Sequence, residues 1–127
     1  MDKSTLVEMD INEGKELIEA LDKAGVSVQA ALWIYLSEPD EWRFMIAIPM
    51  IDEKGPKKTY TYIQSILAQI TQPTIALKDI SIVSPNYDLI KLLKMAISTG
   101  PGIHGIRMKR NTVNNVFIED LYIYRIQ

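Results

Sequence analysis

The residues most able to do chemistry gather in one stretch near the C-terminus, residues 98–120. This stretch holds the only histidine, His104, together with three of the six glycines and the densest group of cations. Histidine is the one side chain with an unperturbed pKa near neutrality, so His104 is the natural candidate for proton transfer. The G-x-S-x-G pattern that marks the serine nucleophile of many hydrolases is absent from the chain.

Period-two alternation predicts a strand that begins at His104. One face would hold His104, Ile106, Met108 and Arg110, and the other would hold Gly105, Arg107 and Lys109. We place His104 on the inward face, where a histidine more often packs or hydrogen-bonds than reacts. We therefore assign no catalytic residue and lean against an enzyme. A metal-dependent phosphodiesterase or a hydrolase is the third hypothesis.

A metal site finds little support in the sequence. Two adjacent carboxylate pairs, Asp52-Glu53 and Glu119-Asp120, are candidates, and Lys109 lies on the strand expected to pair with Glu119. Successive strand residues point to opposite faces, so each pair would offer one ligand per face. The chain has no cysteine, which excludes thiolate zinc sites, iron–sulfur clusters and disulfides. We predict no metal and no cofactor.

Two segments could receive a phosphate group. One is the expected helix start at Ser84-Pro85-Asn86, where free amides attract anions, and the other is the glycine-rich turn of residues 100–105. Neither is followed by the G-K-[ST] of a P-loop. The glycine-rich turn also precedes a strand and not a helix, so it is not a dinucleotide fingerprint.

A basic group forms the clearest surface signal and motivates the second hypothesis, a nucleic-acid-binding module. Tyr122 and Tyr124 share one face of the last expected strand, and aromatic rings beside cations on a sheet can stack bases and bind phosphates. No RNP-like aromatic motif accompanies them. The candidate nucleic-acid contacts are Lys57, Lys58, Arg107, Lys109 and Arg110.

Charge is divided unevenly along the chain, whose net charge is −2. Residues 1–56 carry five cations and twelve carboxylates, a net −7, whereas residues 57–127 carry nine and four, a net +5. Such asymmetry can mark a partner surface or self-association. Our first hypothesis is a small non-enzymatic accessory protein that binds a protein partner or itself through a sheet edge. We place this edge on the strand Val116–Ile126, with Phe117, Tyr122 and Tyr124 as interface residues.

The elements that position these residues follow from periodicity and turn signals. Apolar residues recur at helical spacing in three segments that we expect to be helices: residues 10–24, 57–71 and 86–98. In the first of these, Asp10 and Glu13 have the spacing of a capping box, and the acidic side with Glu13 and Asp22 is expected to face solvent. Strand-like segments are residues 26–36, which we expect to be central, 42–51, 80–83, 104–110 and 116–126. Alternation in the last strand fails at Glu119-Asp120, which indicates a bulge or an exposed edge.

The order α-β-β-α-β-α-β-β predicts an α+β fold with a mainly antiparallel five-stranded sheet packed with three helices. The 127 residues suit one compact domain, residues 1–127, in which we expect residues 1–9 to be loosely ordered. No apolar run is long enough to span a membrane, and the first residues lack the apolar core of a secretory signal. We expect a cytoplasmic protein that does not bind membranes.

Overall fold

The computed structural model describes residues 6–70 and 75–127, and the elements of these ranges appear in the expected order. The helices are α1 (Glu8–Lys23), α2 (Met50–Leu67), the short 3-10 helix η1 (Leu77–Asp79) and α3 (Asp88–Ala96). The strands are β1 (Ala30–Ser37), β2 (Asp40–Ala47), β3 (Ile80–Val83), β4 (Ile106–Val113) and β5 (Val116–Ile126). The predicted α+β fold is therefore confirmed.

The five strands form one sheet in the order β3-β2-β1-β5-β4. All neighbours are antiparallel except β2 and β3, which run parallel. β1 is central, as predicted. β5, however, lies between β1 and β4, so our expectation that all of Val116–Ile126 forms an edge is wrong. The second half of β5, from Leu121 onward, is not an edge because it pairs with β1.

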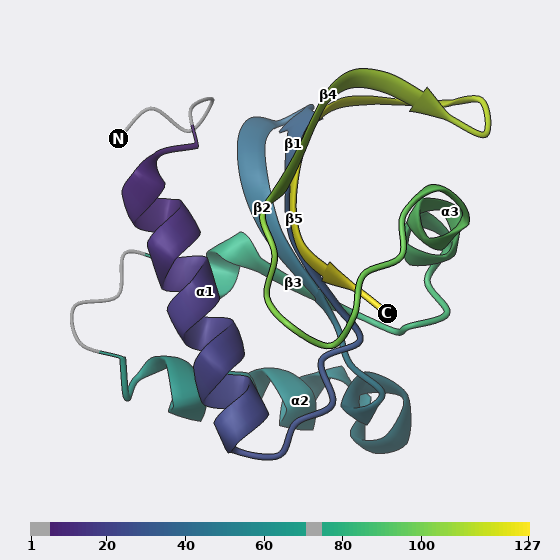
Figure 1. Cartoon of the computed structure of the whole chain (residues 1–127). Helices are drawn as coiled ribbons and strands as arrows, with labels where there is room; N and C mark the ends of the chain where they lie inside the picture. The colour runs from purple at the N-terminus through teal and green to yellow at the C-terminus, as the bar shows by residue number, and fades with distance from the viewer. Residues whose placement is uncertain (1–5, 71–74) are drawn as a thin grey trace.

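Helices cover both faces of the sheet. Figure 1 shows α1 and α2 on one side and α3 on the other. The two faces carry separate apolar clusters, one around Leu17, Phe44 and Ile63 and the other around Leu32, Ile90 and Leu121. Within residues 6–70 and 75–127, no helix combines the length and apolar character needed to cross a bilayer.

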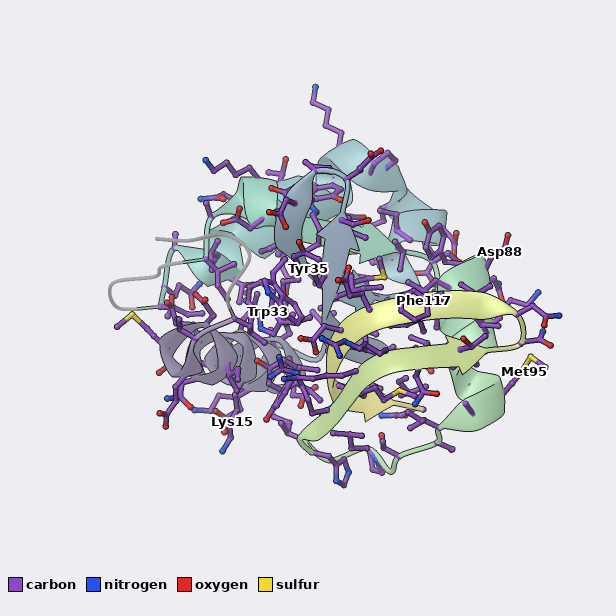
Figure 2. All side chains as sticks on the ribbon, turned by 90° about the horizontal axis from the view of Figure 1, so that it is seen from above. Lys15, Trp33, Tyr35, Asp88, Met95 and Phe117 are labelled. Atoms are coloured by element: carbon purple, nitrogen blue, oxygen red, sulfur yellow. The ribbon has the colours of Figure 1, made fainter. Side chains whose placement is uncertain are left out.

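The β4–β5 hairpin bends away from the rest of the sheet half-way along its length. Its outer half, which we call the arm (residues 110–120), crosses over α3 (Figures 1 and 2). The pairing of β1 with β5 stops at Ile34↔Leu121, before the arm begins. Pairing within the hairpin is interrupted as well, between Lys109↔Asp120 and Asn111↔Ile118.

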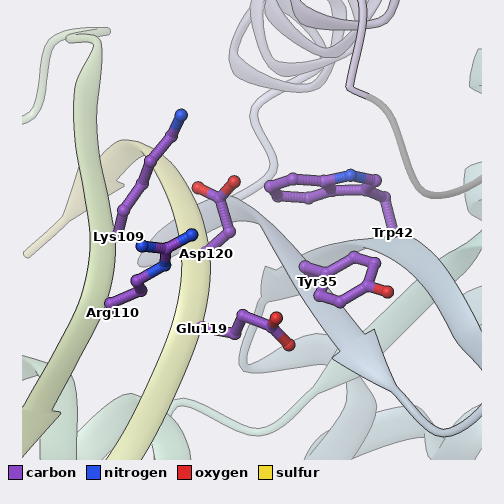
Figure 3. A pocket seen from close by; sticks show the side chains of 6 residues that line it. All are labelled: Tyr35, Trp42, Lys109, Arg110, Glu119 and Asp120. Carbon is purple, nitrogen blue, oxygen red and sulfur yellow. The ribbon is translucent and has the colours of Figure 1, made fainter.

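A left-handed residue lies at this bend. Arg110 has φ of 48°, a conformation that side-chain-bearing residues seldom adopt. On α3's side of the sheet, Met108 and Val113 are five residues apart, and Ile118 and Leu121 are three apart. Regular alternation requires even spacings, so both strands change face at the bend. As a result Lys109, Arg110, Glu119 and Asp120 line one common cleft (Figure 3), and our expectation that Glu119 and Asp120 point to opposite faces is wrong.

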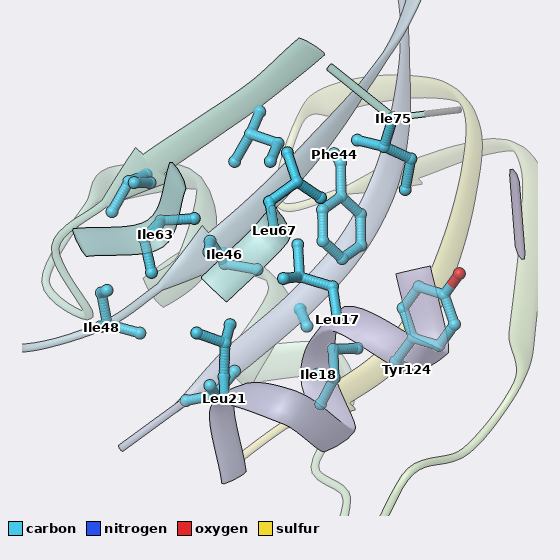
Figure 4. Close-up of a cluster of buried hydrophobic side chains, with 14 of the residues drawn as sticks. Leu17, Ile18, Leu21, Phe44, Ile46, Ile48, Ile63, Leu67, Ile75 and Tyr124 are labelled. Atoms are coloured by element: carbon cyan, nitrogen blue, oxygen red, sulfur yellow. The ribbon is translucent and has the colours of Figure 1, made fainter. Parts of the chain in front are cut away.

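Tyr124 lies between α1 and the sheet, where a Cβ on Gly14 would overlap its hydroxyl. Tyr124 is 1% exposed and lies in the core beside Phe44, Leu17 and Ile18 (Figure 4). Its hydroxyl donates to the Ile11 carbonyl at 2.6 Å and accepts from Trp33 Nε1 at 3.1 Å. Because it is buried, Tyr124 cannot serve as the interface residue that we predicted.

The first helix begins earlier than the sequence pattern indicates. α1 starts at Glu8 after the extended residue Val7, so Asp10 is not the N-cap, and Glu8 and Met9 are helical and not loosely ordered. Residues 1–5 lie outside the described residues. Asp10 and Glu13 are buried, and Asp22 pairs with Arg125, so the acidic side of this helix is only partly a solvent face.

The other helices also differ from expectation near their starts. α2 begins at Met50, earlier than expected, but its part from Pro56 onward agrees with the predicted helix start. The expected break is present inside it as a kink at Gly55, where φ is 82° and ψ is 166°. α2 ends at Leu67, before residue 71 where we placed its end, and residues 71–74 lie outside the described ranges. α3 is shorter than expected because its first turn begins only at Asp88.

His104 does not point inward. β4 begins at Ile106, so His104 precedes the strand and its side chain is exposed. Only its backbone is held, by a 2.7 Å hydrogen bond from its N–H to the Tyr124 carbonyl. The irregular turn before β4 explains the difference, because alternation has no meaning outside a strand.

Candidate functional site

An unpaired strand edge runs along the arm. Residues 116–120 of β5 pair with β4 on one side, and the register with β1 ends before them at Leu121. In the described part of the chain no other strand adjoins their second side. Free backbone N–H and C=O groups on such an edge are a template for an added strand.

The other two edges of the sheet are protected. β3 has only four residues, and the Tyr60 hydroxyl accepts a hydrogen bond from its Ile82 N–H at 2.9 Å. The outer edge of β4 carries Arg107, Lys109 and the left-handed Arg110, and both charge and irregular backbone hinder strand addition. Among the inner strands β1, β2 and β5, residues 116–120 are the longest stretch that pairs on one side only, ahead of residues 40–43 of β2 and 35–37 of β1.

An apolar pocket lies beside this edge, between the arm and the first part of α3. It has a volume of about 430 Å³ and is lined by Tyr87, Asp88, Leu89, Leu92, Asn114 and Val116. Tyr87 and Val116 are exposed by 47% and 45% although both are large and apolar. Asp88 is the only charged residue in the lining, so the pocket suits an apolar side chain.

Phe117 extends the apolar surface onto the outer face of the arm. Its side chain is 62% exposed, and the next residue, Ile118, is buried against α3. Figure 2 shows Phe117 above the arm, with Asp88 and Met95 at α3 on opposite sides of it. Of the five large apolar side chains exposed in the described residues, four lie on α3, at its start or on the arm: Tyr87, Met95, Val116 and Phe117.

A polar cleft of about 260 Å³ lies where the arm parts from β1 and β2. Figure 3 shows the rings of Tyr35 and Trp42 on one side, Lys109 and Arg110 on the other, and the two carboxylates of β5 between them. Tyr35 and Trp42 are cross-strand neighbours. Their rings pack edge to face with their centres 5.6 Å apart.

One ion pair closes the inner end of this cleft. Arg107 Nε and Nη2 donate to the two Asp120 oxygens at 2.6 and 2.7 Å, and the guanidinium lies 5.4 Å from the centre of the Trp42 ring. The hydrogen bond to Asp120 raises the pKa of Arg107 above its ordinary value. Arg107 is therefore held by neighbours within the chain and is not a free cation.

The cations predicted to contact nucleic acid do not form one surface. Lys57 and Lys58 lie on α2, which packs against the β3 side of the sheet, whereas Arg107, Lys109 and Arg110 belong to β4 at the opposite edge. Of the three predicted cations of β4, Lys109 and Arg110 line one cleft and have no ion pair among the described residues, whereas Arg107 is paired with Asp120.

Of the predicted interface residues, the structure leaves one fully available. Phe117 is exposed, Tyr122 is partly buried beside Tyr124, and Tyr124 is in the core. Sequence reasoning missed Tyr87, Leu89 and Leu92, because a leucine at helical spacing indicates a core stripe. The signal available was Tyr87, a large aromatic residue between a turn and a helix.

The structure gives no support to the candidate metal sites or to a phosphate at the start of the third helix. No group of three or more His, Asp or Glu side chains that could hold a metal is present in residues 6–70 and 75–127. Asp52 accepts a 2.7 Å hydrogen bond from the Ser84 hydroxyl, which itself accepts from the Asn86 N–H. A carboxylate thus already lies beside the helix start that was expected to attract an anion.

Comparison of the chain with models of protein families, with curated proteins and with solved structures finds no match.

Proposed function

We propose that this protein is a non-enzymatic binding module that takes an extended segment of a partner protein along residues 116–120 of β5. The observation that supports this proposal is the unpaired strand edge beside an exposed apolar pocket. In strand addition the main chain supplies hydrogen bonds, and side-chain pockets supply specificity.

The two faces of the arm match the two faces of an added strand. Side chains of a bound segment alternate in direction, so every second one would point toward α3 and the pocket lined by Tyr87 and Leu92. The side chains between them would lie on the outer face beside Phe117. We therefore expect a partner segment in which every second residue is apolar.

The affinity is expected to be modest. A short strand buries less surface than a standard protein–protein interface, and such small interfaces are typical of transient complexes. A dissociation constant on the order of micromolar is the result we expect.

Selection of short random peptides displayed against the full chain tests the proposal, with affinities of the selected peptides measured by fluorescence anisotropy. Phe117→Thr retains strand propensity, and Tyr87→Ser places a good capping residue at the N-cap of α3. Each is expected to weaken binding about tenfold, the scale of an aromatic contact residue at an interface. Tyr87→Ser should at the same time raise the free energy of unfolding by roughly 0.5–1 kcal/mol.

Met95→Gln is the matched control, because Met95 is also exposed on α3 but lies on the other side of the arm. It should bind as the original chain does. The proposal is wrong if no peptide is enriched, or if all three variants bind selected peptides equally well. Light scattering on the chain alone identifies a second copy as the occupant if the mass is twice 14.5 kDa.

A further inference from the structure

We infer that Lys109 and Arg110 form a subsite for carboxylate side chains of the bound segment, so that the partner segment alternates apolar with acidic residues. This inference rests on the proposed function, because it concerns the outer face of the same added strand. It assigns a role to the polar cleft lined by Tyr35, Trp42, Lys109, Arg110, Glu119 and Asp120.

The backbone holds the two cations on one side of the strand. Neighbouring residues in a regular strand point to opposite faces, which would separate Lys109 from Arg110. The left-handed conformation of Arg110 brings both into the same cleft. Such a conformation is unfavourable for a residue with a Cβ, and residues of this kind concentrate at functional sites.

Neither cation is neutralised within the described chain. Asp120 is engaged on both oxygens by Arg107, and no ion pair of Lys109 or Arg110 is present among the described residues. Glu119 is then the only other carboxylate in the cleft, so two unpaired cations meet one unpaired anion. The net positive charge of the cleft therefore favours the binding of an anionic group.

A bound segment would lie close enough to meet these side chains. Adjacent strands are roughly 4.8 Å apart, so a strand added to β5 would run roughly 10 Å from β4. Lysine and arginine from β4 and a glutamate from the added strand extend toward each other over β5.

A substitution of Glu119 distinguishes an acidic bound segment from a basic one. It lies in the same cleft, so it repels an acidic segment and attracts a basic one. If the segment is acidic, Glu119→Gln should tighten binding. If the segment is basic, the same variant should weaken it.

The experiment uses peptides selected on the unmodified full chain, together with versions in which each acidic residue is replaced by its amide. We expect acidic residues at alternate positions, and a twofold to fivefold loss of affinity for each amide replacement, the range of exposed ion pairs. Lys109→Gln and Arg110→Asn should each cause a similar loss, and asparagine retains the left-handed backbone. Glu119→Gln should raise the affinity twofold to fivefold.

The control is the double variant Lys57→Gln, Lys58→Gln, which removes two charges at the opposite side of the sheet and should leave binding unchanged. Thermal melts confirm that each variant is folded. The inference is overturned if selected peptides bind but carry no acidic preference, or if Glu119→Gln weakens binding. Either result leaves the strand-addition proposal standing, whereas a failure to enrich any peptide removes that proposal itself.

Discussion

At the scale of single residues, Gly14 determines how closely α1 approaches the sheet. A Cβ on Gly14 would overlap the hydroxyl of Tyr124 and come within 3.1 Å of the Phe44 ring. Neither neighbour can move easily, because both rings are fully buried. The space that glycine leaves is therefore part of the core packing.

Gly14→Ala should lower the free energy of unfolding by about 1–3 kcal/mol, the cost of overpacking. This outcome opposes helix propensity, which favours alanine over glycine by about 1 kcal/mol. Urea denaturation measures the change. Gly100→Ala is the control, since no heavy atom lies within 4 Å of its Cβ position, and a loss equal to that of Gly14→Ala would contradict this account.

Tyr124 should make stability depend on alkaline pH. Burial raises the pKa of Tyr124 above its ordinary value, so the folded protein retains the phenolic proton to higher pH than the unfolded chain does. The contribution of Tyr124 to the free energy of unfolding is therefore fully present below about pH 10. Above that pH it decreases by up to about 1.4 kcal/mol per pH unit. Tyr124→Phe should cost about 1–2 kcal/mol at neutral pH, because it removes two hydrogen bonds.

Urea denaturation from about pH 8 to about pH 11 compares the two chains. The difference in stability between the original chain and Tyr124→Phe should shrink as the pH rises above about 10. A constant difference would mean that Tyr124 is accessible to solvent in the folded state.

Residue roles were the part of the structure that the sequence indicated least well. Tyr122 and Tyr124 have the same spacing whether they face solvent or α1, and only the three-dimensional position of Gly14 and Trp33 decides between these cases. The sequence pattern assigned no role to Arg125. In the structure it is 3% exposed and bonds to Asp22, Val28 and Gly102, which are distant in sequence.

At the scale of elements, the arm is the feature that a regular strand pattern does not predict. The sequence indicated both strands of the hairpin, although it placed the first at residues 104–110 and not at Ile106–Val113, and an irregularity at Glu119-Asp120. It did not indicate that Arg110 is left-handed, because arginine has no preference for that conformation. At the bend Arg110 is left-handed, and the pairing of β5 with β1 ends at Leu121, which leaves residues 116–120 free on one side.

The backbone at Arg110 can be tested by stability. Arg110→Gly should leave the free energy of unfolding unchanged or raise it by up to about 1 kcal/mol, because glycine adopts positive φ freely. Arg110→Val should lower it by about 1–2 kcal/mol, since a β-branched residue is strained there. Urea midpoints report the difference, and equal midpoints for the two variants would argue for a regular strand at this position.

At the scale of the whole molecule, the topology explains why the outermost strands do not supply the binding edge. The sheet order places β3 and β4 at its two edges, and each is protected by side chains or backbone geometry. The sequence predicted the element order correctly, since caps, prolines and apolar periodicity are local signals. Which strand pairs with which is a non-local property, and for that reason the edge was misplaced.

The central claim is that a partner segment adds as a strand to residues 116–120, and amide hydrogen exchange of the full chain with and without a selected peptide tests it most directly. We predict that the backbone amides of residues 116–120 that point away from β4 exchange at least tenfold more slowly in the complex. The amides on the outer edge of β4 should be unchanged. Protection of the β4 edge instead, or unchanged exchange at residues 116–120 with peptide bound, would contradict the proposed mode of binding.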